Sequence, residues 1–94
     1  MYAKLHAGGQ VLACCDKELA GRILKEGELE FSVSEKFYKD VEVSREQLKE
    51  MLQESGNANL VGEKAVQIAL ELGIIGKNNV KYIQGIPHTI ILKL

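Results

Sequence analysis

Alternating hydrophobic and polar positions near the start of the chain predict a β-hairpin. Residues 2–7 and 10–15 form two short β-like runs that Gly8-Gly9 separates, and this dipeptide tolerates the positive φ angles of a two-residue turn. In that hairpin the numbers of paired residues sum to 17. One face then carries apolar side chains and should meet the core: Ala3, Leu5, Leu12 and Cys14.

A second hairpin is predicted at the end of the chain. Residues 80–84 and 88–94 read as strands around a turn at Gly85-Ile86-Pro87. The closing strand is apolar on both faces, which is typical of a strand inside a sheet or at an interface. A further strand is predicted over residues 28–33, where polar and apolar residues alternate, and residues 41–43 are expected to be extended.

Helices are predicted between the hairpins. Asp16 is a candidate N-cap for a short helix over 17–20 that Gly21 ends. Ser44 and Gln47 form a capping box before a helix over 45–55. A third, largely buried helix is expected over about 60–72, with Asn57 or Asn59 as its N-cap and Gly62 in its first turn.

This order of elements predicts an α+β fold. We expect a single compact domain over residues 1–94, with an antiparallel sheet from the N- and C-terminal hairpins packed against two or three helices. The composition agrees, since 46% hydrophobic and 27% charged residues are typical of a soluble globular domain.

Cysteine usage and the N-terminus predict a cytoplasmic protein. Cys14 and Cys15 are neighbours, so on a strand they point to opposite faces and cannot easily bond to each other. The first residues lack the apolar core of a secretion signal, and no stretch approaches the ~18 apolar residues that span a bilayer. With two cysteines and two histidines in all, no metal site and no cofactor are expected.

The net charge of −1 conceals an uneven distribution. Residues 1–25 and 55–94 each carry a net charge of +2, whereas residues 26–54 carry −5. The basic residues of the two ends, among them Arg22 and Lys25, could form one basic face if the two hairpins were neighbours in the sheet. RNA or a component of translation is therefore a candidate partner, although the few aromatic residues count against a stacking platform.

Two segments are candidates for a functional site. Glycine inside a helix costs about 1 kcal/mol relative to alanine, so Gly62, between Asn59 and Glu63, indicates that another backbone or a ligand approaches closely. The second segment ends in His88, directly after the single proline. Together with Cys15, these residues complete the candidate site, with His88 as the acid or base if a reaction is catalysed.

Four short strings of residues carry a likeness to a known family. They are Ala13-Cys14-Cys15-Asp16, Leu19-Ala20-Gly21 with Glu26-Gly27, Asn59-Leu60-Val61-Gly62-Glu63 and Gly85-Ile86-Pro87-His88. On these strings the chain resembles the small archaeal domain-of-unknown-function family number 424. Cys15 matches the family's cysteine before the aspartate, whereas Cys14 departs from a position that is often small and apolar. The resemblance implies one compact cytoplasmic domain and no established activity.

Three functions are consistent with these features. The first is a non-catalytic binding module for RNA or a translation component. The second is a small enzyme or ligand-binding protein with a site near Asn59, Glu63 and His88, which requires their two segments to meet in space. The third is a self-associating protein, such as a homodimer, that pairs through the apolar closing strand. None of the three involves a membrane.

Overall fold

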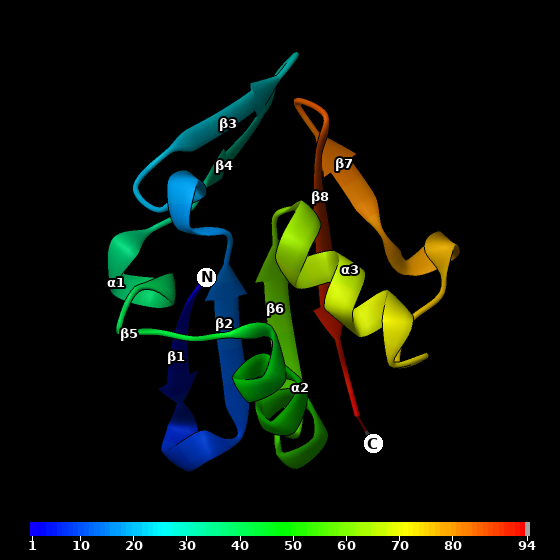
Figure 1. Cartoon of the computed structure of the whole chain (residues 1–94). Helices are drawn as coiled ribbons and strands as arrows, with labels where there is room; N and C mark the ends of the chain where they lie inside the picture. Colours follow the sequence, from blue (N-terminus) through cyan, green and yellow to red (C-terminus); the bar gives the residue numbers. More distant parts are fainter. Residues whose placement is uncertain (94) are drawn as a thin grey trace.

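The computed structural model describes residues 1–93, in which six strands form one mixed sheet in the order β5-β1-β2-β6-β8-β7 (Figure 1). The strands are β1 (Tyr2–His6), β2 (Val11–Cys15), β5 (Val41–Glu42), β6 (Asn57–Val61), β7 (Lys81–Ile83) and β8 (Ile86–Ile91). β2 and β6 are parallel, and the other neighbours in this sheet are antiparallel. The α+β class is as predicted, but the sheet is not purely antiparallel.

The opening hairpin has the predicted register. Tyr2 pairs with Cys15 and His6 pairs with Val11, so the paired numbers sum to 17. The predicted two-residue turn is wrong, because four residues connect the strands and Ala7–Gly9 form a 3-10 turn. The loop takes up the left-handed backbone at three successive residues, with φ of 52° at Ala7, 65° at Gly8 and 91° at Gly9.

The closing hairpin turns earlier than predicted. Its tight turn is Gln84-Gly85, with φ of 54° and 75°, which is typical of a two-residue β-turn. Ile86 and Pro87 therefore belong to β8 and not to the turn. Of the predicted strand over 88–94, β8 contains residues 88–91, and Leu94 lies outside the described residues.

β6 is the main element that the sequence did not predict. The sequence pattern predicts the cap and first turn of a helix at residues 57–61, whereas these residues form a central strand between β2 and β8. The alternation of Asn57 and Asn59 with apolar neighbours is a strand pattern, but asparagine is also a common helix cap. The helix itself, α3, is Glu63–Glu71.

The remaining elements lie between these strands. They are β3 (Ile23–Glu26) and β4 (Leu29–Ser32), which form a separate two-stranded ribbon, and the helices α1 (Glu35–Tyr38) and α2 (Arg45–Glu54). β4 and α2 agree with their predicted segments, whereas β3 was not predicted. The capping box at Ser44 and Gln47 is present. Residues 17–20 were predicted to form a helix, but Lys17–Leu19 form a single 3-10 turn.

Two hydrophobic clusters pack on opposite faces of the main sheet. The helical face bears Ala3, Leu12, Cys14 and Leu60, and α2 and α3 lie against it (Figure 1). The ribbon face bears Ala13, Cys15, Val61 and Ile83, and it packs against side chains of the β3–β4 ribbon and α1, among them Leu24, Phe31 and Tyr38. Leu5, predicted to face the core, lies at the far end of its strand and is 49% exposed.

The ribbon is tied to the turn of the closing hairpin at one end. The backbone amide of Lys25 donates to Gln84 Oε1 at 2.9 Å, and the backbone amide of Gln84 donates to Glu26 Oε1 at 2.9 Å. Within residues 1–93, no helix has the length and apolar character needed to cross a membrane.

Candidate functional site

Asn59 and His88 meet on the ribbon face of the sheet. Because β6 and β8 are antiparallel neighbours, Val61 lies opposite His88 and Asn59 lies opposite Ile90. His88 Nε2 is 3.0 Å from Asn59 Oδ1, and the Tyr38 hydroxyl donates to the same oxygen at 2.7 Å. An amide oxygen can only accept, so His88 carries its proton on Nε2. The three side chains form a hydrogen-bonded polar triad, Tyr38–Asn59–His88.

The His88 ring is half-buried beside the ribbon. Burial lowers its pKa from the usual 6.5, since the low-dielectric surroundings disfavour the charged imidazolium. The ring centroid is 4.6 Å from that of Phe31, and the rings are tilted by 50°. His88 is therefore a neutral, fixed N–H donor near pH 7, with Phe31 against its ring.

A hollow of about 360 Å³ lies next to the triad, at the edge of the sheet. Its lining is Asn79, Lys81, His88, Thr89 and Ile90. β7 begins at Lys81, opposite His88, so Thr89 to Ile91 have no strand beside them on that edge of β8. The Thr89 hydroxyl donates to the Asn79 carbonyl at 2.8 Å, while the Ile90 side chain is 56% exposed. The hollow combines an amide, an ammonium, an imidazole and an apolar surface.

Packing against Asp16, and not the approach of a ligand, accounts for the glycine at position 62. Gly62 precedes α3 with φ of 113°, and a Cβ at this position would overlap the Asp16 carboxylate. That carboxylate is 2% exposed, and it accepts from the backbone amides of Lys64 at 3.0 Å and Ala65 at 2.9 Å. Asp16 was predicted to cap residues 17–20. It caps α3 instead, because the donors at the start of that helix lie beside it.

Both cysteines are buried and inert as acids. Burial raises the pKa of Cys15 to about 11, and the neighbouring Asp16 charge adds to this. Burial also raises the pKa of Cys14 to about 12, with the Cys15 thiol as a further cause. Because the nucleophile is the thiolate, neither residue is equipped for nucleophilic chemistry near pH 7.

The structure does not bring all the predicted site residues together. Glu63 lines a groove on the helical face with Tyr82 and Pro87, whereas His88 faces the ribbon side. Lys25 lies on the ribbon, 4.0 Å from Glu30, and Arg22 is exposed just before it. Of the predicted site residues Asn59, Glu63 and His88, only Asn59 and His88 are in contact.

Tyr38, Lys81 and Asn79 were not among the predicted site residues. Tyr38 lies in residues 34–40, where the sequence pattern predicts neither a helix nor a strand. Lys81 and Asn79 reach the hollow because β7 pairs with β8. The predicted turn at Gly85-Ile86-Pro87 gives a different register, in which Lys81 does not lie opposite His88. Within residues 1–93, no cluster of three or more His, Cys, Asp or Glu side chains could hold a metal ion.

Comparisons with known proteins agree with this architecture. A family model described as "Protein of unknown function (DUF424)" matches residues 4–94. The chain is also similar to a solved structure, described as an uncharacterized conserved protein from Methanopyrus kandleri, with 23% sequence identity and a TM-score of 0.73. The match covers 99% of this chain and 92% of that one, and it shows a shared fold. No curated protein matches the chain.

Proposed function

The chain belongs to the DUF424 family of proteins of unknown function, and we propose that it is a non-catalytic binding module for single-stranded RNA in the cytoplasm. The observation that carries the proposal is the polar triad Tyr38–Asn59–His88 beside the hollow on the ribbon face. Proteins recognise single-stranded RNA by holding unstacked bases against side chains of a sheet and hydrogen-bonding their edges.

The hollow has groups suited to each part of a nucleotide. The exposed Ile90 side chain offers an apolar surface to the face of a base. Asn79, whose amide oxygen accepts from the Gly76 backbone amide, keeps its amide nitrogen for a base edge. Lys81 supplies a positive charge for a phosphate, and it makes no ion pair within residues 1–93. The volume of the hollow, about 360 Å³, is within the range of ligand pockets, which begins at about 300 Å³.

The same geometry argues against catalysis at this site. A histidine that acts as a general base needs a free nitrogen and, in most cases, a carboxylate that orients it. With its Nε2–H donated to Asn59, His88 has Nδ1 as its basic nitrogen, but the group that orients the ring is an amide and not a carboxylate, and the predicted carboxylate, Glu63, lies on the other face. Because the thiol of Cys15 is buried and protonated, the site offers a fixed donor and no nucleophile.

The basic residues of the two chain ends are not equally placed to bind RNA at the hollow. The two terminal hairpins are separated by β6, so they do not form one continuous basic face. Lys93 is engaged by carbonyl oxygens at the end of α2. Lys81 and Lys77, which precedes Asn79 in the 3-10 turn, are the lysines near the hollow. The cytoplasmic location rests on the two free, adjacent cysteines, which suit a reducing compartment.

Fluorescence anisotropy with a labelled oligouridine or oligoadenosine of about twelve nucleotides tests the proposal. We expect micromolar binding at about 50 mM salt that weakens steeply towards about 200 mM, because phosphate contacts release counterions. The variant Lys81→Gln should bind more weakly and show a salt slope smaller by about 0.7. Lys49→Gln, which removes a charge from α2 on the helical face, is the matched control.

Two results would contradict the proposal. One is the absence of binding at high protein concentration in low salt. The other is equal loss of affinity in Lys81→Gln and Lys49→Gln, which would indicate non-specific attraction to the whole surface. Light scattering of the free protein in the same buffer gives its oligomeric state and therefore the stoichiometry of the complex.

A further inference from the structure

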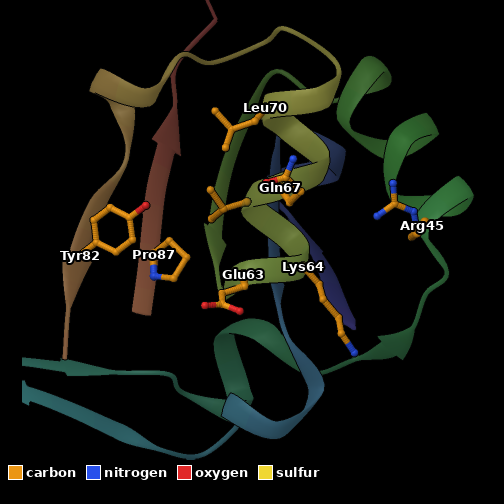
Figure 2. Close-up of a pocket in the computed structure, with 8 residues that line it drawn as sticks. Arg45, Glu63, Lys64, Gln67, Leu70, Tyr82 and Pro87 are labelled. Carbon is orange, nitrogen blue, oxygen red and sulfur yellow. The ribbon is translucent and has the colours of Figure 1, made fainter. Parts of the chain in front are cut away.

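A groove of about 430 Å³ runs beside α3 on the helical face, away from the proposed RNA site (Figure 2). Its apolar lining comes from α3 and from the closing hairpin: Val66, Leu70, Pro87 and the Tyr82 ring. Tyr82 and Pro87 lie opposite each other on β7 and β8. Tyr82 is 62% exposed, so a large aromatic side chain stands at the rim of the groove with most of its surface in solvent.

A carboxylate stands at one end of this groove. Glu63 is the first residue of α3, and Figure 2 shows its carboxylate on the side of the helix that faces Pro87, whereas Lys64 extends to the other side. Glu63 makes no ion pair within residues 1–93. Its negative charge is therefore available to a ligand.

Two cations line the groove, Arg45 and Lys64, and within residues 1–93 neither pairs with Glu63. Arg45 Nη2 is 2.7 and 2.8 Å from the two carboxylate oxygens of Glu71. This pairing directs Arg45 towards the end of α3 that is remote from Glu63 and balances its charge. The rim between Glu63 and Tyr82 consequently combines an unpaired negative charge with an exposed aromatic ring.

We propose that this groove binds an arginine side chain of a partner peptide. The guanidinium would stack on the Tyr82 ring and donate to the Glu63 carboxylate, while its aliphatic stem lies on Pro87 and Val66. A planar guanidinium can do both at once, since it stacks on aromatic faces and pairs with a carboxylate through two N–H groups. A lysine ammonium is more strongly hydrated and makes a point contact. An apolar neighbour of the arginine would fill the part of the groove near Leu70.

Nuclear magnetic resonance titration of the ¹⁵N-labelled full chain tests this site. The probe is the blocked pentapeptide Ala-Leu-Arg-Leu-Ala, and the comparison peptides carry citrulline or lysine in place of arginine. We expect saturable shifts of the backbone amides around Glu63 and Tyr82. Citrulline keeps the shape and loses the charge, so it should bind at least about fivefold more weakly, and lysine should be intermediate.

Two variants locate the binding. Glu63→Gln and Tyr82→Leu should each weaken the arginine peptide by about fivefold, whereas Glu46→Gln, which removes an equivalent charge from α2, should leave its affinity unchanged. Equal binding of the citrulline peptide, shifts that cluster elsewhere, or the same loss in Glu46→Gln would overturn the proposal. The result is independent of RNA binding, because the two sites lie on opposite faces of the sheet.

Discussion

The Asp16 carboxylate occupies the space that a side chain at Gly62 would fill. Gly62 stands at the N-cap position of α3 and has no side chain with which to cap it. Asp16, at the end of β2, supplies the missing cap from 48 residues away by accepting from Lys64 and Ala65. This contact joins the end of one central strand to the start of the helix that follows the next central strand. Asp16, packed against Gly62 and bonded to the start of α3, therefore fixes this helix to the parallel part of the sheet.

The variant Gly62→Ala should be strongly destabilised. It forces an L residue into a backbone with φ of 113° and places a methyl group on the Asp16 carboxylate, and we expect a loss of about 3 kcal/mol in the free energy of unfolding. Gly73→Ala, at the other end of α3, is the matched control, since its φ is 73° but a Cβ there meets nothing within 4 Å. Its cost should be about 1 kcal/mol. Urea unfolding measures both, and equal losses would show that the overlap with Asp16 is unimportant.

Local patterns predicted the local structure of this chain well. The register of β1 and β2 followed from side-chain alternation, and the start of α2 followed from Ser44 and Gln47, three residues apart. The cap of α3 could not be found in this way, because Asp16 and the backbone amides that donate to it are far apart in the sequence. Residues 57–61 were misassigned because Asn57 and Asn59 fit both a helix cap and the alternation of a strand.

In the candidate site, too, the sequence predicted individual residues but not the long-range contacts between them. Asn59 and His88 were singled out as unusual residues, but only the pairing of β6 with β8 brings them into contact. Glu63 follows Asn59 closely in the sequence, yet the chain passes from strand to helix between them and leaves Glu63 on the other face. Tyr38, which completes the triad, comes from a short helix whose position depends on the whole ribbon.

The two cysteines should resist alkylation in the folded protein. Both are completely buried, and pKa values of about 12 for Cys14 and about 11 for Cys15 leave almost no thiolate at pH 8. We expect iodoacetamide to modify neither residue in native buffer and both in urea, as measured by mass spectrometry. Rapid modification of Cys15 alone in native buffer would contradict this prediction and would indicate a reactive thiol at that position.

The stability of the protein should depend on the protonation of His88. Burial lowers its pKa in the folded state below the 6.5 of an exposed histidine, so between these two values the unfolded chain binds more protons. The contribution of neutral His88 is therefore complete above about pH 6.5 and is lost as the pH falls towards the folded-state pKa. His88→Gln should lose less stability than the wild type between pH 7 and pH 5, as measured by urea unfolding. Equal losses would exclude His88 as the cause.

Lys93 should stabilise α2 and contribute nothing to RNA binding. Its ammonium donates to the Leu52 carbonyl at 2.6 Å and to the Ser55 carbonyl at 2.8 Å. These carbonyls lie at the C-terminal end of α2, where a positive charge is favourable. Lys93→Met, which keeps the aliphatic stem, should lower the free energy of unfolding by about 1 kcal/mol in low salt and by less in high salt.

The same variant separates a general basic surface from the hollow at Lys81. If RNA binds at the hollow, Lys93→Met should keep its affinity for the labelled oligonucleotide within about twofold while Lys81→Gln weakens it, because the ammonium of Lys93 is held against α2 and not at the hollow. A loss in Lys93→Met as large as that in Lys81→Gln would instead assign binding to the summed charge of the C-terminal lysines. The two substitutions remove one positive charge each, so net charge cannot account for a difference between them.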